Sequence, residues 1–510
     1  MRTEILRAFR FTLAPTSVQE QRLLRWCGNS RLAFNYALAA KKAAHEDWRT
    51  QVVALVDAGV EEATARKRVK VPIPTKPTVY KRFMAERGDD RYGIEGVAPW
   101  WHEVGSRVYQ SAFLDADAAW KNWLDSFKDK RAGRRVGYPR FKKRGLARDS
   151  FCIHHDVKKP GIRLTTYRRL RLPAFGEIRL HDNARRLGRL INRDEAVIQS
   201  VTVSRSGHRW YASVLCKVQV DLPEKPTRAQ RTAGTVGVDL GIEKLATLSR
   251  PLDPKDPARE GHFVTNPRHL ARMAKRLRRA QRALSRKQKG SARRDKARRR
   301  VARLHHEVTV RRHAALHQVT KKLATRYATI HIEDLHVAGM TATARGTLER
   351  PGRNVRQKAG LNRAILDTAM AETRRQLTYK TSWYGSQLAV LDRWWPSSKT
   401  CSDCGWRNPS LTLNERMFHC AQCGLVLDRD LNAARNIERH TAAHPAPHQV
   451  PYGKGETQNA RGEPEVRLPR PRVGKQGSVK REDARPSQAP PRRSNPPTSP
   501  RMRKGNAKPS

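Results

Sequence analysis

Acidic residues are scarce in this chain, in which Asp and Glu total 47 against 104 Lys and Arg. The formal net charge of +57 over 510 residues would make the chain repel itself unless a polyanion neutralised it. We expect that polyanion to be nucleic acid, bound through its backbone in a strongly salt-dependent way. The deficit of acids therefore argues against protein classes that do not bind nucleic acid. A basic surface kept for solubility, or a ribosome-associated protein, is the alternative.

Cysteine and long apolar runs are also scarce, and each shortage excludes a class of protein. Only seven Cys are present, and Cys27, Cys152 and Cys216 are scattered singly, which is typical of a reducing compartment rather than a disulfide framework. No stretch approaches the ~18 apolar residues that cross a membrane, and the first ten residues lack the apolar segment of a signal peptide. We therefore expect a soluble, cytoplasmic protein with no membrane partner.

The remaining cysteines form two C-x-x-C pairs late in the chain. Cys401 pairs with Cys404 and Cys420 with Cys423, and fifteen residues separate the two pairs. This spacing is typical of a zinc ribbon, in which two knuckles bring four thiolates around one tetrahedral ion. Four protein ligands leave no open position on the metal, so the predicted zinc is structural. A pair of disulfides is the alternative.

Three segments place carboxylates where a nuclease would need them. Asp239 lies inside an apolar, glycine-flanked strand, where an acid without a partner is costly, although an ordinary turn Asp is the alternative. Glu333 ends another apolar strand, with Asp334 as its competitor. Asp428 and Asp430 follow the second cysteine pair, and either could instead cap the helix that comes next. Such oxygen ligands suit Mg²⁺, and a metal pair ~4 Å apart hydrolyses phosphodiesters, so the acids predict a metal-dependent nuclease.

The remaining pattern divides the chain into strands and helices. A strand over residues 5–14 leads into helices that continue to residue 129, and residues 150–220 are short β-rich runs that predict a small barrel or sandwich. Residues 267–326 hold 22 Lys and Arg but only two acids, and Gly290 should separate two antiparallel helices there. One face of these helices should pack and the other should meet nucleic acid.

Residues 130–145 alternate basic residues with Tyr138 and Phe141. Positive charge with aromatic faces is typical of a site for single-stranded nucleic acid or an A-form backbone. A solvated charged loop explains the same pattern equally well. The aromatic residues of the preceding helix, by contrast, recur at helical intervals and favour a packed core.

Together these motifs resemble the TnpB (OrfB) proteins of bacterial insertion sequences, compact relatives of type V CRISPR effectors. The resemblance covers residues 1 to about 440, and its two final segments are highly specific in combination. The segments are Phe9–Thr16, Asn35–Leu38, Gly137–Lys143, Gly237–Gly241, Ile332–Leu335, Tyr379–Gly385, Pro396–Gly405 and Asp428–Ile437.

The resemblance implies an α/β plus β fold. It implies an RNase H-like RuvC domain with an inserted zinc ribbon, and an N-terminal β-barrel with a helical insert. The expected domains are a wedge-like β-barrel (1–15 and 135–225), a helical recognition insert (16–134), a RuvC-like nuclease domain (235–397 and 426–440), a zinc ribbon (398–425) and a disordered basic tail (441–510). That tail holds 13 of the 30 prolines and one aromatic residue, so it has too little apolar surface to form a core.

The resemblance also implies roles for particular residues. Asp239, Glu333 and Asp430 would be the catalytic, magnesium-binding acids, with Asp428 in support. A further set would lie near the guide or the target duplex: Tyr138, Arg140, Phe141, Lys142 and Lys143.

The expected activity is that of an RNA-guided, magnesium-dependent DNA endonuclease of a transposable element. Its partners would be a guide RNA from the transposon end and a double-stranded DNA target, and base pairing would read most of the target sequence. The protein would be bacterial and cytoplasmic, and nucleoid-associated when bound to DNA. A transposase that performs strand transfer directly, or a catalytically silent binder, is the alternative. The sequence leaves the oligomeric state open.

Overall fold

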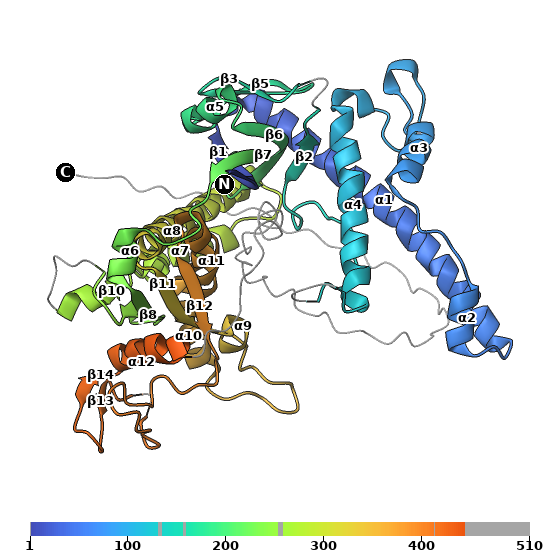
Figure 1. The fold of residues 1–510 in the computed structure, drawn as a ribbon. Helices are drawn as coiled ribbons and strands as arrows, with labels where there is room; N and C mark the ends of the chain where they lie inside the picture. The colour runs from blue at the N-terminus through green and yellow to red at the C-terminus, as the bar shows by residue number, and fades with distance from the viewer. Residues whose placement is uncertain (1, 131–134, 157–159, 253–258, 413, 444–510) are drawn as a thin grey trace, which may run out of the picture. The chain divides into compact units, whose positions relative to one another are not determined.

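The computed structural model describes residues 2–130, 135–156, 160–252, 259–412 and 414–443 (Figure 1). The tail predicted over 441–510 lies outside the described residues, except that the last helix continues to Ala443. Within the described ranges, no helix is both long and apolar enough to cross a membrane.

The first sheet joins the N-terminal strand to strands from much later in the chain. It is antiparallel with the order β1-β7-β6-β2, and β1 pairs with β7 along its whole length, from Arg2 opposite Asp221 to Leu13 opposite Trp210. A second, three-stranded sheet has the order β3-β4-β5. The strands are β1 (Arg2–Leu13), β2 (Ser150–His154), β3 (Arg163–Thr166), β4 (Arg169–Leu172), β5 (Gly176–Arg179), β6 (Ala196–Ser206) and β7 (Arg209–Asp221).

No closed barrel is found among the described strands, contrary to the implied N-terminal β-barrel. The four-stranded sheet ends at β1 and β2, and within the described residues neither has a second neighbouring strand in that sheet. The two sheets meet at a single bridge, between Leu13 and Leu180, instead of through a continuous ladder. The two sheets are therefore open layers.

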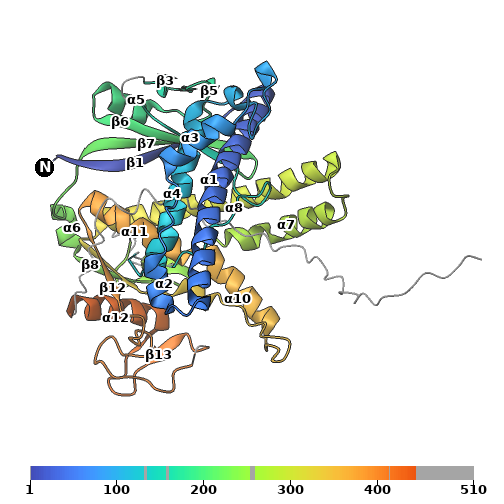
Figure 2. The ribbon, with the colours of Figure 1, turned by 90° about the vertical axis from the view of Figure 1, so that its right-hand side faces the viewer.

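A helical insert follows β1. Its long first helix begins with a capping box: the Thr16 side chain accepts from the backbone N–H of Gln19, and the Gln19 side chain accepts from the backbone N–H of Thr16. Helices α1 and α4 lie side by side (Figure 2), and the aromatic residues Phe113 and Trp120 are buried, which confirms a packed core. The helices are α1 (Ser17–Asp57), α2 (Glu62–Arg68), α3 (Lys76–Glu86) and α4 (Ser106–Phe127), and α5 (Arg185–Asn192) lies between β5 and β6.

The second large sheet has the order β10-β9-β8-β11-β12, in which β8, β11 and β12 are parallel. Helices α8 and α11 contribute Leu323 and Leu377 to the core that buries Val236 and Val238, whereas α12 packs on β8. The elements are α6 (Arg228–Ala233), β8 (Thr235–Asp239), β9 (Lys244–Leu248), β10 (Phe263–Thr265), β11 (Thr329–Glu333), α9 (Val337–Met340), α11 (Met370–Tyr384) and β12 (Gln387–Leu391). The chain is therefore a mixed α/β protein.

Two basic helices, α7 (His269–Ser285) and α8 (Ala292–Arg326), pack through one apolar face. Gly290 lies between them with φ +87°, and the Ser291 hydroxyl accepts from Arg294 N–H to cap α8, so the predicted break is confirmed. Helix α10 (Val355–Thr368) follows, and a small hairpin, β13 (Met417–His419) and β14 (Val426–Asp428), leads into α12 (Arg429–Ala443). The domain boundaries proposed from the sequence stay predictions.

Candidate catalytic and metal sites

Two predicted acids meet because two strands run parallel. Ile332 of β11 pairs with Val238 of β8, so the next residue on each strand, Glu333 and Asp239, lies at the same edge of the sheet. Both side chains are half-buried. The register of two buried strands therefore brings together carboxylates that are far apart in the sequence.

Helix α12 crosses the same strand in the opposite direction. The Thr235 hydroxyl donates to Glu438 Oε1 at 2.5 Å. Two residues further along β8, a Cβ added to Gly237 would lie 2.0 Å from the carbonyl oxygen of Ala434. Four helical residues rise about 6 Å, close to the ~6.6 Å of two strand residues, so these contacts form a matched series. Glycine at position 237 allows this close approach of helix and strand.

The next step of that series pairs Asp239 with Asp430. Burial raises the pKa of Asp239 well above its usual range, and the charges of Glu333 and Asp430 act in the same direction. Burial also raises the pKa of Glu333. Like charges that converge away from water are unfavourable unless a cation joins them. The three carboxylates would therefore need a cation beside them, and carboxylate oxygens are the ligands that a hard divalent cation such as Mg²⁺ prefers.

The two candidates in the third segment have different surroundings. Asp428 Oδ1 accepts from the backbone N–H groups of Asp430 and Leu431, at 3.0 and 3.1 Å, and so caps α12. Lys244 Nζ donates a hydrogen bond to the other oxygen, Asp428 Oδ2, at 2.9 Å. The carboxylate of Asp430 makes a longer contact, 3.7 Å, with the guanidinium group of Arg429. The geometry thus gives Asp428 a structural position and directs Asp430 toward the other acids.

Glu333 and its competitor Asp334 separate in the same way. Hydrogen bonds from Arg393 and Arg374 lower the pKa of Asp334, so two guanidinium groups already hold this carboxylate. Glu333 instead accepts from the Ser397 hydroxyl at 2.5 Å. Sequence reasoning missed Ser397, whose position next to the cysteine pairs gave no sign of a contact with β11.

The four cysteines predicted as metal ligands come together. Sγ atoms of Cys401 and Cys423 are 3.7 Å apart, those of Cys404 and Cys420 are 3.5 Å apart, and all four lie within 4.8 Å of one another. A tetrahedron with Zn–S bonds of ~2.3 Å has edges of about 3.8 Å, whereas a disulfide would need ~2.05 Å. All four are free thiols, so the arrangement can hold one metal ion and contradicts the disulfide alternative.

Each knuckle repeats the same local turn. Cys404 and Cys423 are each followed by a glycine with positive φ, at +83° for Gly405 and +71° for Gly424. Backbone N–H groups also point at the sulfurs, as in Asp403 N–H to Cys401 Sγ at 3.4 Å. These local features explain why the sequence predicts the cluster so directly.

Helix α12 also ties the cysteine cluster to the acids. Asn432 Nδ2 donates to the Thr400 carbonyl at 2.7 Å, and its Oδ1 accepts from Ser402 N–H at 2.8 Å. One turn later, Asn436 Nδ2 donates to the Ser397 carbonyl at 2.8 Å. Both asparagines are buried. One face of α12 therefore holds the first cysteine knuckle, and the other carries Asp430 to the sheet.

The five residues predicted to contact nucleic acid have unequal surroundings. Tyr138 packs edge-on against Trp123, with ring centroids 4.8 Å apart, yet is 38% exposed. The ammonium group of Lys142 lies 3.7 Å from the centre of the Phe34 ring. Arg140, Phe141 and Lys143 are also exposed, and the ammonium group of Lys42 lies 4.7 Å from the centre of the Phe141 ring. Contact of this segment with nucleic acid stays a prediction.

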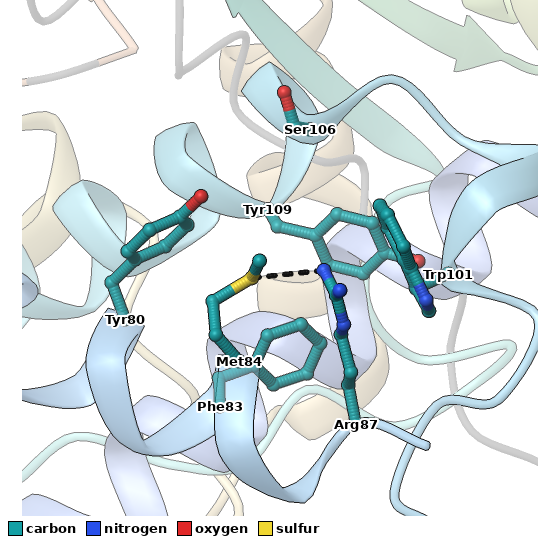
Figure 3. Close-up of a pocket in the computed structure, with 7 residues that line it drawn as sticks. All are labelled: Tyr80, Phe83, Met84, Arg87, Trp101, Ser106 and Tyr109. Carbon is teal, nitrogen blue, oxygen red and sulfur yellow. Dashed lines mark hydrogen bonds between the residues drawn. The ribbon is translucent and has the colours of Figure 1, made fainter. Parts of the chain in front are cut away.

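A separate pocket of about 190 Å³ lies in the helical insert (Figure 3). Arg87 fills part of it, with its guanidinium 3.5 Å from the centre of the Trp101 ring and an N–H near Met84 Sδ. The lining is largely aromatic and contains no carboxylate: Tyr80, Phe83, Met84, Arg87, Trp101, Ser106 and Tyr109. It therefore offers no second acid site.

Three family models match the chain. One described as "Probable transposase" (OrfB, IS605) matches residues 213–344, and one described as the TNB domain of Cas12f1-like proteins matches residues 371–437. A third, described as a helix-turn-helix domain, matches residues 1–49. Those residues contain strand β1 and part of one continuous helix, α1, so no helix-turn-helix is present there.

Relatives extend over nearly the same length. The Mycobacterium tuberculosis protein "Putative RNA-guided DNA endonuclease Rv2885c" is 35% identical over 442 residues, which cover 85% of this chain and 86% of the relative. Escherichia coli "Putative RNA-guided DNA endonuclease InsQ" is 33% identical, over 85% of this chain and 91% of the relative. A solved Cas12f1–sgRNA–target DNA complex aligns at 12% identity with a TM-score of 0.44, over 85% of this chain and 99% of that one.

Proposed function

This chain belongs to the TnpB (OrfB) family of insertion-sequence proteins, and from that premise we propose that it is an RNA-guided, magnesium-dependent DNA endonuclease of a transposable element. The observation that carries the proposal is the strand register that places Asp239 and Glu333 at one edge of a sheet, where the charge of Asp430 also acts on Asp239. The names of relatives that match most of the chain support the same activity.

In this proposal the three acids hold Mg²⁺. When bound, a metal pair activates the attacking water and stabilises the leaving oxygen of the phosphodiester. The chain's own part is to hold the carboxylates in place. Strands β8 and β11 fix Asp239 and Glu333, the Ser397 hydroxyl orients Glu333, and the Asp428 cap fixes the end of α12 that carries Asp430.

The four cysteines would hold structural Zn²⁺. Thiolates bind zinc well, and a site with four protein ligands leaves no position open for substrate. The hydrogen bonds from Asn432 and Asn436 to the first knuckle support a role in placing α12.

Nucleic acid would bind on the basic surfaces. We assign a guide RNA from the transposon end and a double-stranded DNA target as partners, in the bacterial cytoplasm. The cationic faces of α7 and α8 support this assignment, as does the exposed segment with Arg140, Phe141 and Lys143. The five-stranded sheet β10-β9-β8-β11-β12 would belong to an RNase H-like RuvC domain, the open N-terminal sheets would form the wedge, and the helical insert would form the recognition part.

A second candidate is a transposase that transfers strands itself. The description of the family model over residues 213–344 as "Probable transposase" favours it. Three carboxylates serve either reaction, so the acids do not separate the two. A requirement for a guide RNA does.

The test is to isolate the protein with its native flanking DNA and to sequence the RNA that co-purifies. A discrete RNA that ends in sequence beside the element, together with Mg²⁺-dependent cutting of a DNA that matches it, is the expected result. Heterogeneous RNA that high salt removes, with joining of DNA ends by the protein alone, would overturn the proposal in favour of the transposase.

A further inference from the structure

Trp394 has the most exposed side chain of the eleven tryptophans, all of which lie in described segments. It is 84% exposed, whereas the next, Trp100, is 40% exposed and the others are half-buried or buried. Burial of the large apolar indole ring is strongly favourable, so tryptophan side chains that stay exposed to water are common at binding surfaces. Exposure alone decides little, and the surroundings of this indole carry the argument.

Both chain neighbours of Trp394 are anchored. Arg393 donates to the carboxylate of Asp334 at the end of β11. Trp395 stacks on His440 of α12, with ring centroids 4.3 Å apart and planes 16° from parallel. The exposed indole is thus displayed on a turn that is fixed from both sides, so little conformational entropy would be lost when a flat partner stacks on it.

The turn is also next to the acids. Leu391, three residues before Trp394, pairs with Glu333 in the sheet, and Ser397, three residues after it, donates to the Glu333 carboxylate. The Trp394 backbone N–H donates to Asp392 Oδ1 at 2.8 Å and closes the turn between them. The turn that bears the indole is therefore next to Glu333.

We propose that Trp394 stacks on one nucleobase of the DNA strand that enters the carboxylate edge. Single-stranded DNA is bound by aromatic faces next to positive charge, and beside the turn Arg374 and Arg393 share the single carboxylate of Asp334, so this group of three keeps one net positive charge. Every base has a π face, so this contact would tolerate any sequence, as a nuclease whose sequence is read by a guide requires. The inference rests on the proposed function, since it assigns a contact of the same site.

The experiment combines a protein change with a base deletion. Ribonucleoprotein of wild type and of Trp394→Ala is given targets with one abasic nucleotide at each position around the cut, and single-turnover cleavage rates are measured. Stacking on one base is worth a factor of about 5 to 150. We expect Trp394→Ala to slow cleavage of the intact target by such a factor. At one position, the abasic target should slow wild type equally and the variant hardly further.

Two further variants separate stacking from bulk. Trp394→Phe keeps an aromatic face and should retain the rate within a few-fold, whereas Trp394→Leu should behave like Trp394→Ala. Tyr92→Ala removes another aromatic side chain, 74% exposed in the helical insert, and should show no coupling at any position. Equal slowing of wild type and Trp394→Ala at every abasic position would overturn the inference. If wild type fails to cut the intact guided target, the proposed function itself is refuted.

Discussion

The cysteine cluster and the carboxylate edge are both proposed as sites for cations, but the chain assembles them in opposite ways. Cys401 to Cys423 form a closed set of four ligands from one short segment, held by two repeated turns. Asp239, Glu333 and Asp430 come from two strands and a helix that are far apart in the sequence, and in the proposed function they form an open set. A closed set serves structure and an open one serves chemistry. The two sites share one element, α12, so damage to the first should reach the second.

The largest effect should come from the open site. Asp239→Asn keeps the shape of the side chain but removes a metal ligand and a charge, so guided cleavage should fall by at least 10²–10³-fold, on the order seen when one key electrostatic group is removed. Rates of single-turnover cutting check this, with target affinity measured in parallel to show that binding persists.

Asp428→Asn is the matched control for that substitution. It changes an acid two residues from Asp430 that caps α12 and pairs with Lys244, so it should cost far less activity. Equal losses from the two variants would contradict the distinction between a structural and a metal-binding acid.

Removal of the closed site's metal should have the next largest effect. Cys404→Ser leaves three thiolates, so zinc content should fall and α12 should lose its anchor. Cleavage should drop by about 10–100-fold, which is typical when a residue that does not itself bind the metal no longer holds a metal ligand, here Asp430, in position. Metal analysis together with cleavage rates measured at saturating Mg²⁺ checks this.

Cys216→Ser is the control, because it alters a buried thiol that lies on β7, away from both sites. A Cys404→Ser protein without zinc but with full cleavage activity would show that the two sites are independent.

Gly237→Ala should disturb the carboxylate site by pushing the backbone of α12 away from β8. Its Cβ would lie 2.0 Å from the Ala434 carbonyl oxygen, which belongs to backbone and cannot rotate away. Overpacking of this kind typically costs about 1–3 kcal/mol, and the shift of α12 would also move Asp430. Denaturant unfolding and cleavage rates measure the two consequences.

Gly360→Ala is the comparison for that change. Gly360 lies in helix α10, and the nearest atom to its added Cβ is the end of the Arg363 side chain at 3.9 Å. Alanine should stabilise the helix there by up to ~1 kcal/mol. If Gly237→Ala and Gly360→Ala had the same free energy of unfolding, this would contradict the close contact between β8 and α12.

The same contrast explains what the sequence could predict. The cysteine ligands follow from spacing and following glycines, which are local signals. Asp239 and Glu333 follow from acids inside apolar strands, but their meeting depends on the register of β8 and β11. The choice of Asp430 over Asp428 came from the family resemblance, and the helix–strand contact at Gly237 supplies a physical reason for it.

Long-range contacts are what sequence reasoning could not supply. Ser397 and Lys244 reach acids that are 64 and 184 residues away, and no local pattern marks such partners. The implied N-terminal β-barrel is not confirmed, since no closed barrel is found among the described strands; strand composition predicts strands but leaves the pairing of edge strands β1 and β2 undetermined.

Ser397→Ala should reduce cleavage less than Asp239→Asn, Cys404→Ser or Gly237→Ala. A single hydrogen bond to Glu333 contributes about 0.5–1.5 kcal/mol, so cleavage should fall by about 2- to 12-fold with little change in unfolding free energy. Ser397→Thr keeps the hydroxyl and should restore most of the rate, which a purely steric role would not. The Mg²⁺ concentration for half-maximal activity should rise in Ser397→Ala, because a less ordered Glu333 binds the metal less well. An unchanged Mg²⁺ requirement would remove Ser397 from the site.

The smallest expected effect is a pH dependence of stability that only the open site should show. Burial and neighbouring charges raise the folded-state pKa of Asp239 above its unfolded value, so the folded protein binds more protons in that interval. Without Mg²⁺, the contribution of Asp239 to stability should therefore be fully present below the ordinary Asp pKa of about 3.9 and should be lost as pH rises through the folded-state pKa. Saturating Mg²⁺ favours the ionised acids and should remove the decline, as should Asp239→Asn. Thermal unfolding of zinc-loaded protein at a series of pH values, with and without Mg²⁺, measures this. A decline that persists in Asp239→Asn would assign it to other groups and leave the convergence of the three acids without this support.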